Sequence, residues 1–129
     1  MVTIKSYTDI EQSKKLAKIL PLESADMFYN EEPEDETYPK DIVDTKYPMV
    51  IREGQKHYLE EYGIPCWSVA ALLSVLPNGT DIVKDEADTE NEHYMCTVGI
   101  KDDIIPTFGK NPIDACVDMI EKLHELNLL

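Results

Sequence analysis

The sequence predicts a single-domain α+β protein, residues 1–129, in which a small antiparallel sheet packs against three helices. Alternating apolar residues at 93–100 and 104–108 predict two adjacent strands, and one or two further strands fit elsewhere. Helical apolar spacing and helix start and stop signals predict helices near 9–20, 66–76 and 112–126. A length of 129 residues is typical of one domain with one hydrophobic core.

The first predicted helix, near 9–20, begins at a capping-box pattern. Thr8 offers a hydroxyl at the cap, and Glu11 offers a side chain three residues later that returns a hydrogen bond. Apolar residues then recur along one side of the helix. Pro21 is expected to end it, because proline cannot continue the hydrogen-bond ladder.

Weaker signals follow between the first and second helices. Residues 25–29 and 47–51 permit short strands, because they are rich in aromatic and apolar side chains. Residues 55–62 permit a short helix that Gly63 would close.

The second predicted helix, near 66–76, lies in the segment PCWSVAALLSVLP at 65–77. Its side chains are apolar on most faces, which indicates a helix largely enclosed by protein. Pro65 suits a first helical turn, and Pro77 prevents extension. Trp67 is the only tryptophan and is expected to anchor the core, with ligand stacking as the alternative.

The strand predicted at 93–100 has one core-facing side. Its inward positions are Tyr94, Cys96, Val98 and Ile100. The returning strand at 104–108 contains Pro106, which has no N–H to donate, so this strand is expected at a sheet edge.

The third predicted helix, near 112–126, has the clearest boundaries. Asn111 is expected to cap it, and Pro112 suits its first position. Apolar residues recur every three or four positions and are expected to be buried: Ile113, Cys116, Val117, Ile120 and Leu123.

Negative charge is concentrated in two places. The chain carries 26 acidic and 12 basic residues, a formal net charge of −14. Most of the excess lies in segments of about 30–45 and 80–92, which are expected to be exposed acidic loops. Such loops repel polyanions, so direct nucleic-acid binding and anionic-membrane binding are not expected, whereas a protein partner contacted through the loops fits the charge.

Cysteine usage and hydropathy predict a cytoplasmic protein. Cys66, Cys96 and Cys116 are odd in number and lie in apolar segments, which is typical of reduced, buried thiols. The sequence has neither an apolar run long enough to cross a bilayer nor the apolar core of a signal peptide.

No motif for nucleotide, phosphate or zinc chemistry is found in the sequence, so no cofactor is expected. The candidate ligand or partner residues are Trp67, His93, Tyr94, Asp85, Glu86 and Asp88. These three acids, together with Glu90 and Glu92, could bind a hard cation, but they lack the register of a twelve-residue calcium loop, which favours a solvated loop.

Two stretches, PCWSVAALLSVLP at 65–77 and NPIDACVDMIEKLHELNLL at 111–129, resemble an uncharacterised family of small proteins from gut Bacteroides and their phages or prophages. Its members share a P-x-W-S helix and an N-P-x-D-A-x-x-x-M-I-x-K-L terminal helix. YTDIEQSKKLAKILP at 7–21 and ESADM at 23–27 are similar to the same family, so about half the chain is covered, and 30–62 departs most. The order of elements more loosely resembles phage α-β-α sandwich domains. The resemblance implies a fold and a genomic context, and it transfers no functional residue.

These observations together predict a non-enzymatic accessory or binding protein of a phage, a prophage or its bacterial host. One alternative is an acidic DNA mimic that occupies the basic groove of a nucleic-acid-binding protein, which would require carboxylates at phosphate-like spacing. The other alternative is a small enzyme with a cleft near Trp67, His93 and Tyr94.

Overall fold

The computed structural model describes residues 5–30, 47–51, 63–85 and 93–129, and it confirms an α+β fold. The helices in this part of the chain are α1 (Ile10–Leu16), α3 (Val69–Val75) and α4 (Pro112–Glu125), with a 3₁₀ turn at Leu22–Ser24. Its strands are β1 (Met27–Asn30), β2 (Met49–Val50), β3 (Gly63–Cys66), β4 (Asp81–Asp85), β5 (His93–Ile100) and β6 (Asp103–Gly109).

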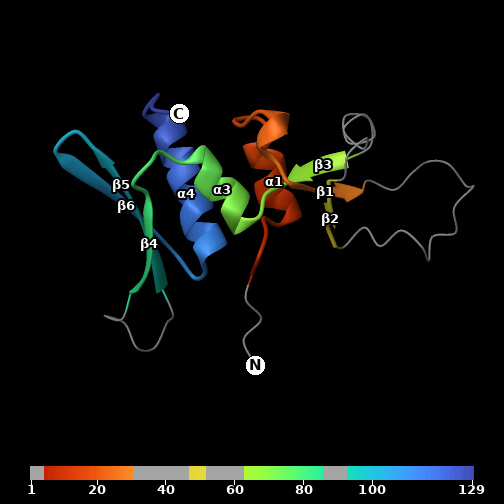
Figure 1. Cartoon of the computed structure of the whole chain (residues 1–129), viewed down its shortest axis with the longest axis horizontal. Helices are drawn as coiled ribbons and strands as arrows, with labels where there is room; N and C mark the ends of the chain where they lie inside the picture. The colour runs from red at the N-terminus through yellow and green to blue at the C-terminus, as the bar shows by residue number, and fades with distance from the viewer. Residues whose placement is uncertain (1–4, 31–46, 52–62, 86–92) are drawn as a thin grey trace, which may run out of the picture.

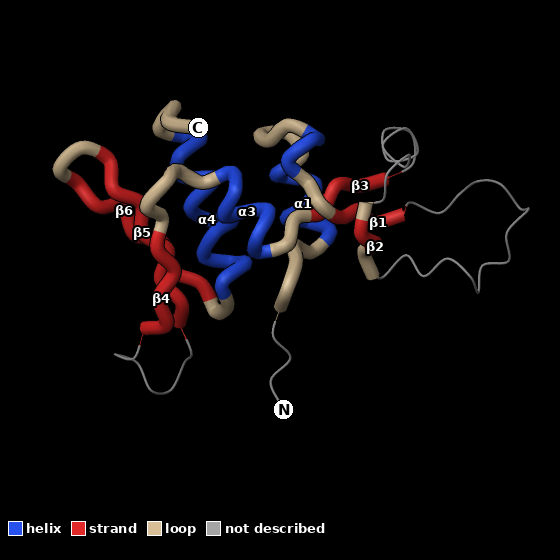
Figure 2. The backbone as a smooth tube through the Cα atoms, viewed as in Figure 1, coloured by secondary structure: helices blue, strands red, loops and turns tan. Residues whose placement is uncertain are grey.

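The strands form two antiparallel sheets rather than the one sheet expected. The first has the order β2-β1-β3 and the second the order β4-β5-β6. The helices lie between the two sheets, with α4 against β5 and β6, α3 against α4, and α1 against β3 (Figures 1 and 2). The predicted hairpin of 93–100 and 104–108 is confirmed as β5 and β6, and Pro106 lies in an edge strand as predicted.

One core joins the helices to the inner face of the β4-β5-β6 sheet. Trp67, Val98 and Ile120 belong to the same buried cluster, although they come from three different elements or their boundaries. The predicted inward face of β5 is confirmed, since Cys96 and Val98 are buried and Tyr94 and Ile100 pack against the cluster. All the predicted apolar positions of α4 are buried as well.

Helix α1 is capped one residue later than predicted. Asp9 is the cap: its side chain accepts a hydrogen bond from the Gln12 N–H, and the Gln12 side chain accepts one from the Asp9 N–H. Thr8 is buried and bonds elsewhere, so its hydroxyl does not serve as the cap. The helix ends at Leu16 and turns continue towards Pro21, so it is shorter than the predicted 9–20.

The segment 63–66 forms β3 instead of beginning a helix. It pairs with β1, with Pro65 opposite Phe28, so Pro65 is in a strand and not in a first helical turn. The helix begins after Ser68, whose side chain accepts a hydrogen bond from the Ala71 N–H. The Ser68 hydroxyl and N–H both bond to the Asp26 carboxylate, which ties this cap to the chain just before β1.

Part of the expected acidic loop at 80–92 is strand β4. Ile82 packs against the core and pairs with Cys96, and this burial outweighs the acidic composition of the segment. Residues 86–92, most of the acidic segment 30–45 and the helix expected at 55–62 lie outside the described residues. Strands β1 and β2 correspond to the short strands permitted at 25–29 and 47–51.

Helix α4 has the predicted start and a defined end. The Asn111 side chain accepts a hydrogen bond from the Asp114 N–H at 2.9 Å, and Pro112 occupies the first helical position. Asn127 has a positive φ of 58°, and the Leu128 N–H reaches the Leu123 carbonyl at 2.8 Å. These bonds satisfy carbonyls that the last helical turn leaves unpaired.

Strand β6 ends in very close contact with the first turn of α4. A Cβ atom on Gly109 would lie 2.5 Å from the Ala115 backbone N and 2.9 Å from two atoms of Asp114. On the same inner face, the Thr107 hydroxyl donates to the Ala115 carbonyl at 2.7 Å. The absence of a side chain at Gly109 therefore lets the helix lie directly on the strand.

Candidate interaction surface

The outer face of the β4-β5-β6 sheet is an apolar surface that the described chain leaves uncovered. Side chains alternate between the two faces of a sheet, and α4 covers the inner one. The register places Val83, Met95 and Phe108 in one row across the three strands of the outer face. Pro106 and Thr97 form the next pair, and Ile104 and Gly99 the pair after it.

The outer apolar positions on the two edge strands are open to solvent, whereas Met95 on the central strand is partly buried. Ile104 is 71% exposed, and Val83 and Phe108 are each 51% exposed. No atom of the described chain lies within 4 Å of a Cβ built on Gly99, so the face is open beside Ile104. Large apolar side chains gathered on one exposed sheet face are typical of an interaction site, whereas scattered ones are not.

Charge on this surface is sparse and negative. By alternation Asp81 and Asp85 are on the outer face of β4 with Val83, and Asp81 is paired with Thr97. The β5–β6 turn adds Lys101 and Asp102, and β6 begins with Asp103, all exposed. The apolar row thus belongs to a molecule that is acidic overall, with a net charge of −14.

The structure confirms the predicted core position of Trp67. The side chain is completely buried, and its indole N–H donates to the Ser24 hydroxyl at 2.9 Å. Ligand stacking, the alternative interpretation, requires an exposed ring face, and no such face exists in this arrangement. Tyr94 lies on the inner face of β5 and packs against the same core, away from the outer row.

The other predicted site residues are placed only in part. The register sets Asp85, the last residue of β4, opposite His93, the first residue of β5. Glu86 and Asp88 lie outside the described residues. The cation-binding interpretation therefore stays a prediction, as does the DNA mimic, whose carboxylates fall mainly in the same part of the chain. Within the described residues, no cluster of His, Cys, Asp and Glu side chains could hold a metal ion.

A hollow of about 380 Å³ opens next to the start of α1. Asp9, Ile10, Glu11 and Tyr29 line it, and none of these was a predicted site residue. The Tyr29 hydroxyl does not face a base: it donates to the Thr8 carbonyl at 2.7 Å. Burial raises the pKa of Tyr29, so this hydroxyl stays protonated. The hollow therefore contains no activated nucleophile.

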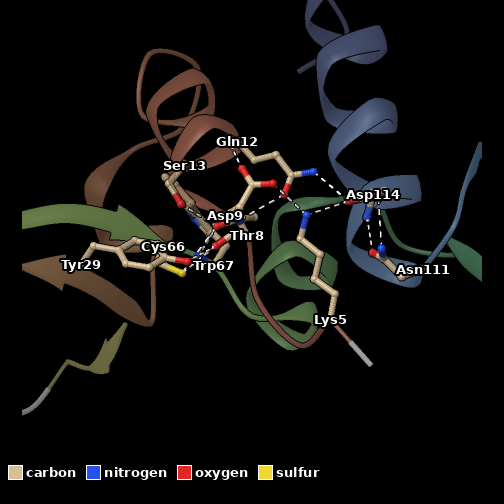
Figure 3. A network of polar contacts seen from close by, with 10 residues as sticks. All are labelled: Lys5, Thr8, Asp9, Gln12, Ser13, Tyr29, Cys66, Trp67, Asn111 and Asp114. Atoms are coloured by element: carbon tan, nitrogen blue, oxygen red, sulfur yellow. Dashed lines mark hydrogen bonds and ion pairs between the residues drawn. The ribbon is translucent and has the colours of Figure 1, made fainter. Parts of the chain in front are cut away.

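A polar network joins the starts of α1 and α4 (Figure 3). The Lys5 ammonium lies 2.9 Å from an Asp9 oxygen and 3.0 Å from an Asp114 oxygen. Gln12 donates to the same Asp114 oxygen at 2.9 Å, and Asn111 donates to the other oxygen at 3.0 Å. Two helices distant in sequence are thereby joined through Lys5 and Gln12, which both contact Asp114.

These contacts shift the pKa of each charged group. Burial lowers the pKa of Lys5, but the hydrogen bonds and charges of Asp9 and Asp114 outweigh it and the net shift is upward. Burial raises the pKa of Asp114, but the Lys5 and Gln12 hydrogen bonds and the Lys5 charge more than compensate, and the net shift is downward. Asp9 is shifted downward in the same way, by the Gln12 and Lys5 hydrogen bonds against burial. All three groups are therefore charged at neutral pH.

A buried part of the network surrounds Thr8 (Figure 3). The Thr8 hydroxyl lies 2.8 Å from the Ser13 hydroxyl and accepts a hydrogen bond from the backbone N–H of Trp67 at 3.1 Å. The Cys66 thiol donates to the Thr8 carbonyl at 3.4 Å. Burial raises the pKa of Cys66, so the thiol remains neutral and unreactive. These contacts link the N-terminal segment to β3 and have a structural role.

Comparison of the chain with protein-family models, with curated proteins and with solved structures finds no match. None of the helices in the described ranges is both long enough and apolar enough to span a bilayer.

The outer sheet face was only partly visible to sequence reasoning. The alternation of β5 placed Met95, Thr97 and Gly99 away from the core. Val83 is not among the predicted strand positions, because the acidic composition of 80–92 predicts a loop there, whereas the structure pairs Val83 with Met95. Ile104 and Phe108 were assigned to a strand, and the pairing that aligns them with β5 shows that they share its outer face.

Proposed function

We propose that this chain is a non-enzymatic accessory or binding protein that contacts a protein partner through the outer face of the β4-β5-β6 sheet. The observation that carries the proposal is the apolar row of Val83, Met95 and Phe108, in which Val83 and Phe108 are exposed, with exposed Ile104 at the end of the same face. Burying such a row against a partner removes apolar surface from water, which is the dominant favourable contribution to protein association.

The polar groups described elsewhere support a binding role over catalysis. The Ser13 and Thr8 hydroxyls bond to each other, the Tyr29 hydroxyl bonds to a carbonyl, and burial keeps the Cys66 thiol protonated. The carboxylates of Asp9 and Asp114 are engaged by Lys5. An acid–base catalyst needs a group whose proton is available at the reaction site, and these groups have their protons or lone pairs committed to structural contacts.

The cellular context is part of the proposal. Three free, buried cysteines support an action in a reducing cytoplasm. The sequence resemblance to small proteins of Bacteroides and their phages or prophages supports a mobile element, or its host, as the source of the partner.

The proposal is tested by comparing what variants of the protein retain from an extract of the cells that encode it. We expect one partner to be retained by the wild type and lost by Ile104→Lys, which places a charge on the same sheet face as the apolar row. Leu128→Lys is the matched control, because it adds the same charge at another exposed leucine-sized side chain, away from the sheet. Equal retention of the same proteins by all three forms would refute a binding role for this face.

A further inference from the structure

The outer sheet face has the dimensions of a short helical contact. Adjacent strands lie about 4.8 Å apart, so the row from Val83 through Met95 to Phe108 is about 10 Å wide. Along β6, the four-residue step from Ile104 to Phe108 covers about 13 Å. A helix is about 10 Å in diameter, and seven of its residues rise about 10 Å, so two turns of a helix would cover the face.

The contour of the face also favours a convex partner. Ile104 projects with 71% of its surface exposed, while Gly99, opposite it on β5, has no side chain and is open above its Cα. The space above Gly99 is therefore free for a side chain of a partner. A helix can supply one, because its successive turns present side chains at regular spacing.

Charge decides which helix fits. The chain has 26 acidic and 12 basic residues, and the outer positions of β4 are Asp81, Val83 and Asp85, with His93 opposite Asp85. At physiological ionic strength charges act over about 8 Å, which reaches from the centre of the face to its edges. A partner rich in Lys and Arg is attracted, whereas an acidic protein, a nucleic acid or a second copy of this chain, itself at −14, is repelled.

We infer that the partner presents a basic amphipathic helix, whose apolar side chains lie on the Val83, Met95 and Phe108 row and whose lysines or arginines face the acidic surroundings. This inference rests on the proposed function, since it names the chemistry of the partner for the same face. The mode is that of a helix laid on an apolar surface, with affinity from the apolar contact and selectivity from charge.

The test uses four synthetic peptides of 18 residues, a length of about five helical turns. Three carry the same leucine stripe with Lys, Gln or Glu at the polar positions, and the fourth is a scrambled form of the Lys peptide without a stripe. Binding to the full chain is measured by titration calorimetry at low and high salt. Backbone amide chemical shifts locate the bound face.

We expect the Lys peptide to bind at least about tenfold more tightly than the Gln peptide at low salt, a difference that high salt reduces. The Glu and scrambled peptides should bind most weakly. The shift changes should centre on Val83, Met95 and Phe108. Ile104→Lys should weaken the Lys peptide by about tenfold or more, and Leu128→Lys should change its affinity by less than about threefold.

The outcomes separate this inference from the proposed function. Equal affinity for the Lys and Gln peptides, with shift changes still on the sheet face, would leave a binding role for the face and overturn the basic partner. Binding of the scrambled peptide as tightly as the striped one, or shift changes elsewhere, would overturn both. A dimer of the chain itself that buries the face would also overturn the inference, because the occupant would then be a second copy.

Discussion

Single residues near the start of the described chain form hydrogen bonds with residues that are distant in sequence. Lys5 reaches Asp114, 109 residues away, and the Thr8 hydroxyl accepts a hydrogen bond from the Trp67 N–H, 59 residues away. The first contact is partly exposed and charged, and the second is buried and neutral. They are therefore expected to respond differently to substitution.

Asp114→Asn should destabilise the protein by about 1 to 2 kcal/mol at pH 7, because it removes the charge that pairs with Lys5 and favours the first turn of α4. The folded-state pKa of Asp114 lies below its unfolded value, so its contribution is complete above the unfolded pKa and is lost as pH falls through the folded pKa. The difference from wild type should therefore shrink below about pH 4. Urea unfolding at a series of pH values measures it.

The control for this substitution is Asp102→Asn, which makes the same charge change in the exposed β5–β6 turn. Its free energy of unfolding should stay within about 0.5 kcal/mol of wild type across the pH range. An equal loss in both variants would show that general charge, and not the Lys5 contact, determines the effect.

Thr8→Val should destabilise the protein by about 2 to 3 kcal/mol. The substitution conserves shape but leaves the Trp67 N–H and the Ser13 hydroxyl without the Thr8 oxygen in a site from which water is excluded. Thr8→Ser keeps the hydroxyl and should retain more of the stability. Chemical denaturation of both variants measures the difference, and equal stability of the two would contradict the role given to the hydroxyl.

Helix caps could be predicted from single residues where the capping contacts lie within the helix itself. Asn111 and Pro112 set the start of α4 as expected, since both act through the backbone of their own helix. At α1 the predicted cap was Thr8 with Glu11, whereas the structure uses Asp9 with Gln12. The Thr8 hydroxyl accepts a hydrogen bond from the backbone N–H of Trp67 and does not cap the helix. Such a long-range partner cannot be inferred from the spacing of residues.

At the scale of elements, the end of β6 lies directly against the start of α4. Of the glycines in β5 and β6, only Gly109 has another backbone so close that a Cβ atom would not fit. Gly109→Ala should destabilise the protein by about 3 kcal/mol, because a new Cβ would lie 2.5 Å from the Ala115 N and one of these backbones must move. Thermal and urea unfolding measure the loss.

Gly99→Ala is the matched control for this contact, since a Cβ at Gly99 on β5 meets open space. Its stability should be equal to or slightly above that of wild type, because alanine loses less backbone freedom on folding than glycine. Comparable destabilisation at Gly99 and Gly109 would mean that the cost comes from the glycine itself and not from the approach of α4.

The elements that sequence reasoning missed are those formed by pairing. The composition of 81–85, with two aspartates and a lysine, indicated a loop, whereas Ile82 is drawn into the core opposite Cys96. In the same way Pro65 indicated a helix start, and pairing of 63–66 with β1 makes the segment a strand. Elements with their own periodicity, β5 and α4, were predicted within a residue or two.

At the scale of the whole molecule, one buried cluster spans the helices and one sheet, so the described structure should unfold as a unit. Trp67 reports on this directly, because it contacts Ser24 and Thr8 on one side and belongs to the cluster that includes Ile120 on the other. Its fluorescence and the far-UV circular dichroism signal should therefore change at the same urea concentration. Two separated midpoints would mean that the β2-β1-β3 side unfolds independently.

The α+β class and the approximate places of the three described helices were predictable, but the division of the strands into two sheets was not. The pairing partners of β1 lie at 49–50 and 63–66, and no local pattern distinguishes a strand that joins β5 from one that forms a second sheet. The candidate surface was hidden for the same reason, since an outer face exists only once three strands are aligned.

The positions of the three cysteine thiols allow the local opening of different parts of this protein to be followed separately. Cys66 reports from β3, while Cys96 and Cys116 report from the boundary of β5 and α4, and none of them has any exposed surface. A thiol-modifying reagent added in pulses can reach each sulfur only when its own neighbourhood comes apart. The order in which the three adducts accumulate, measured by mass spectrometry, would show whether β3 or the contact between β5 and α4 opens first.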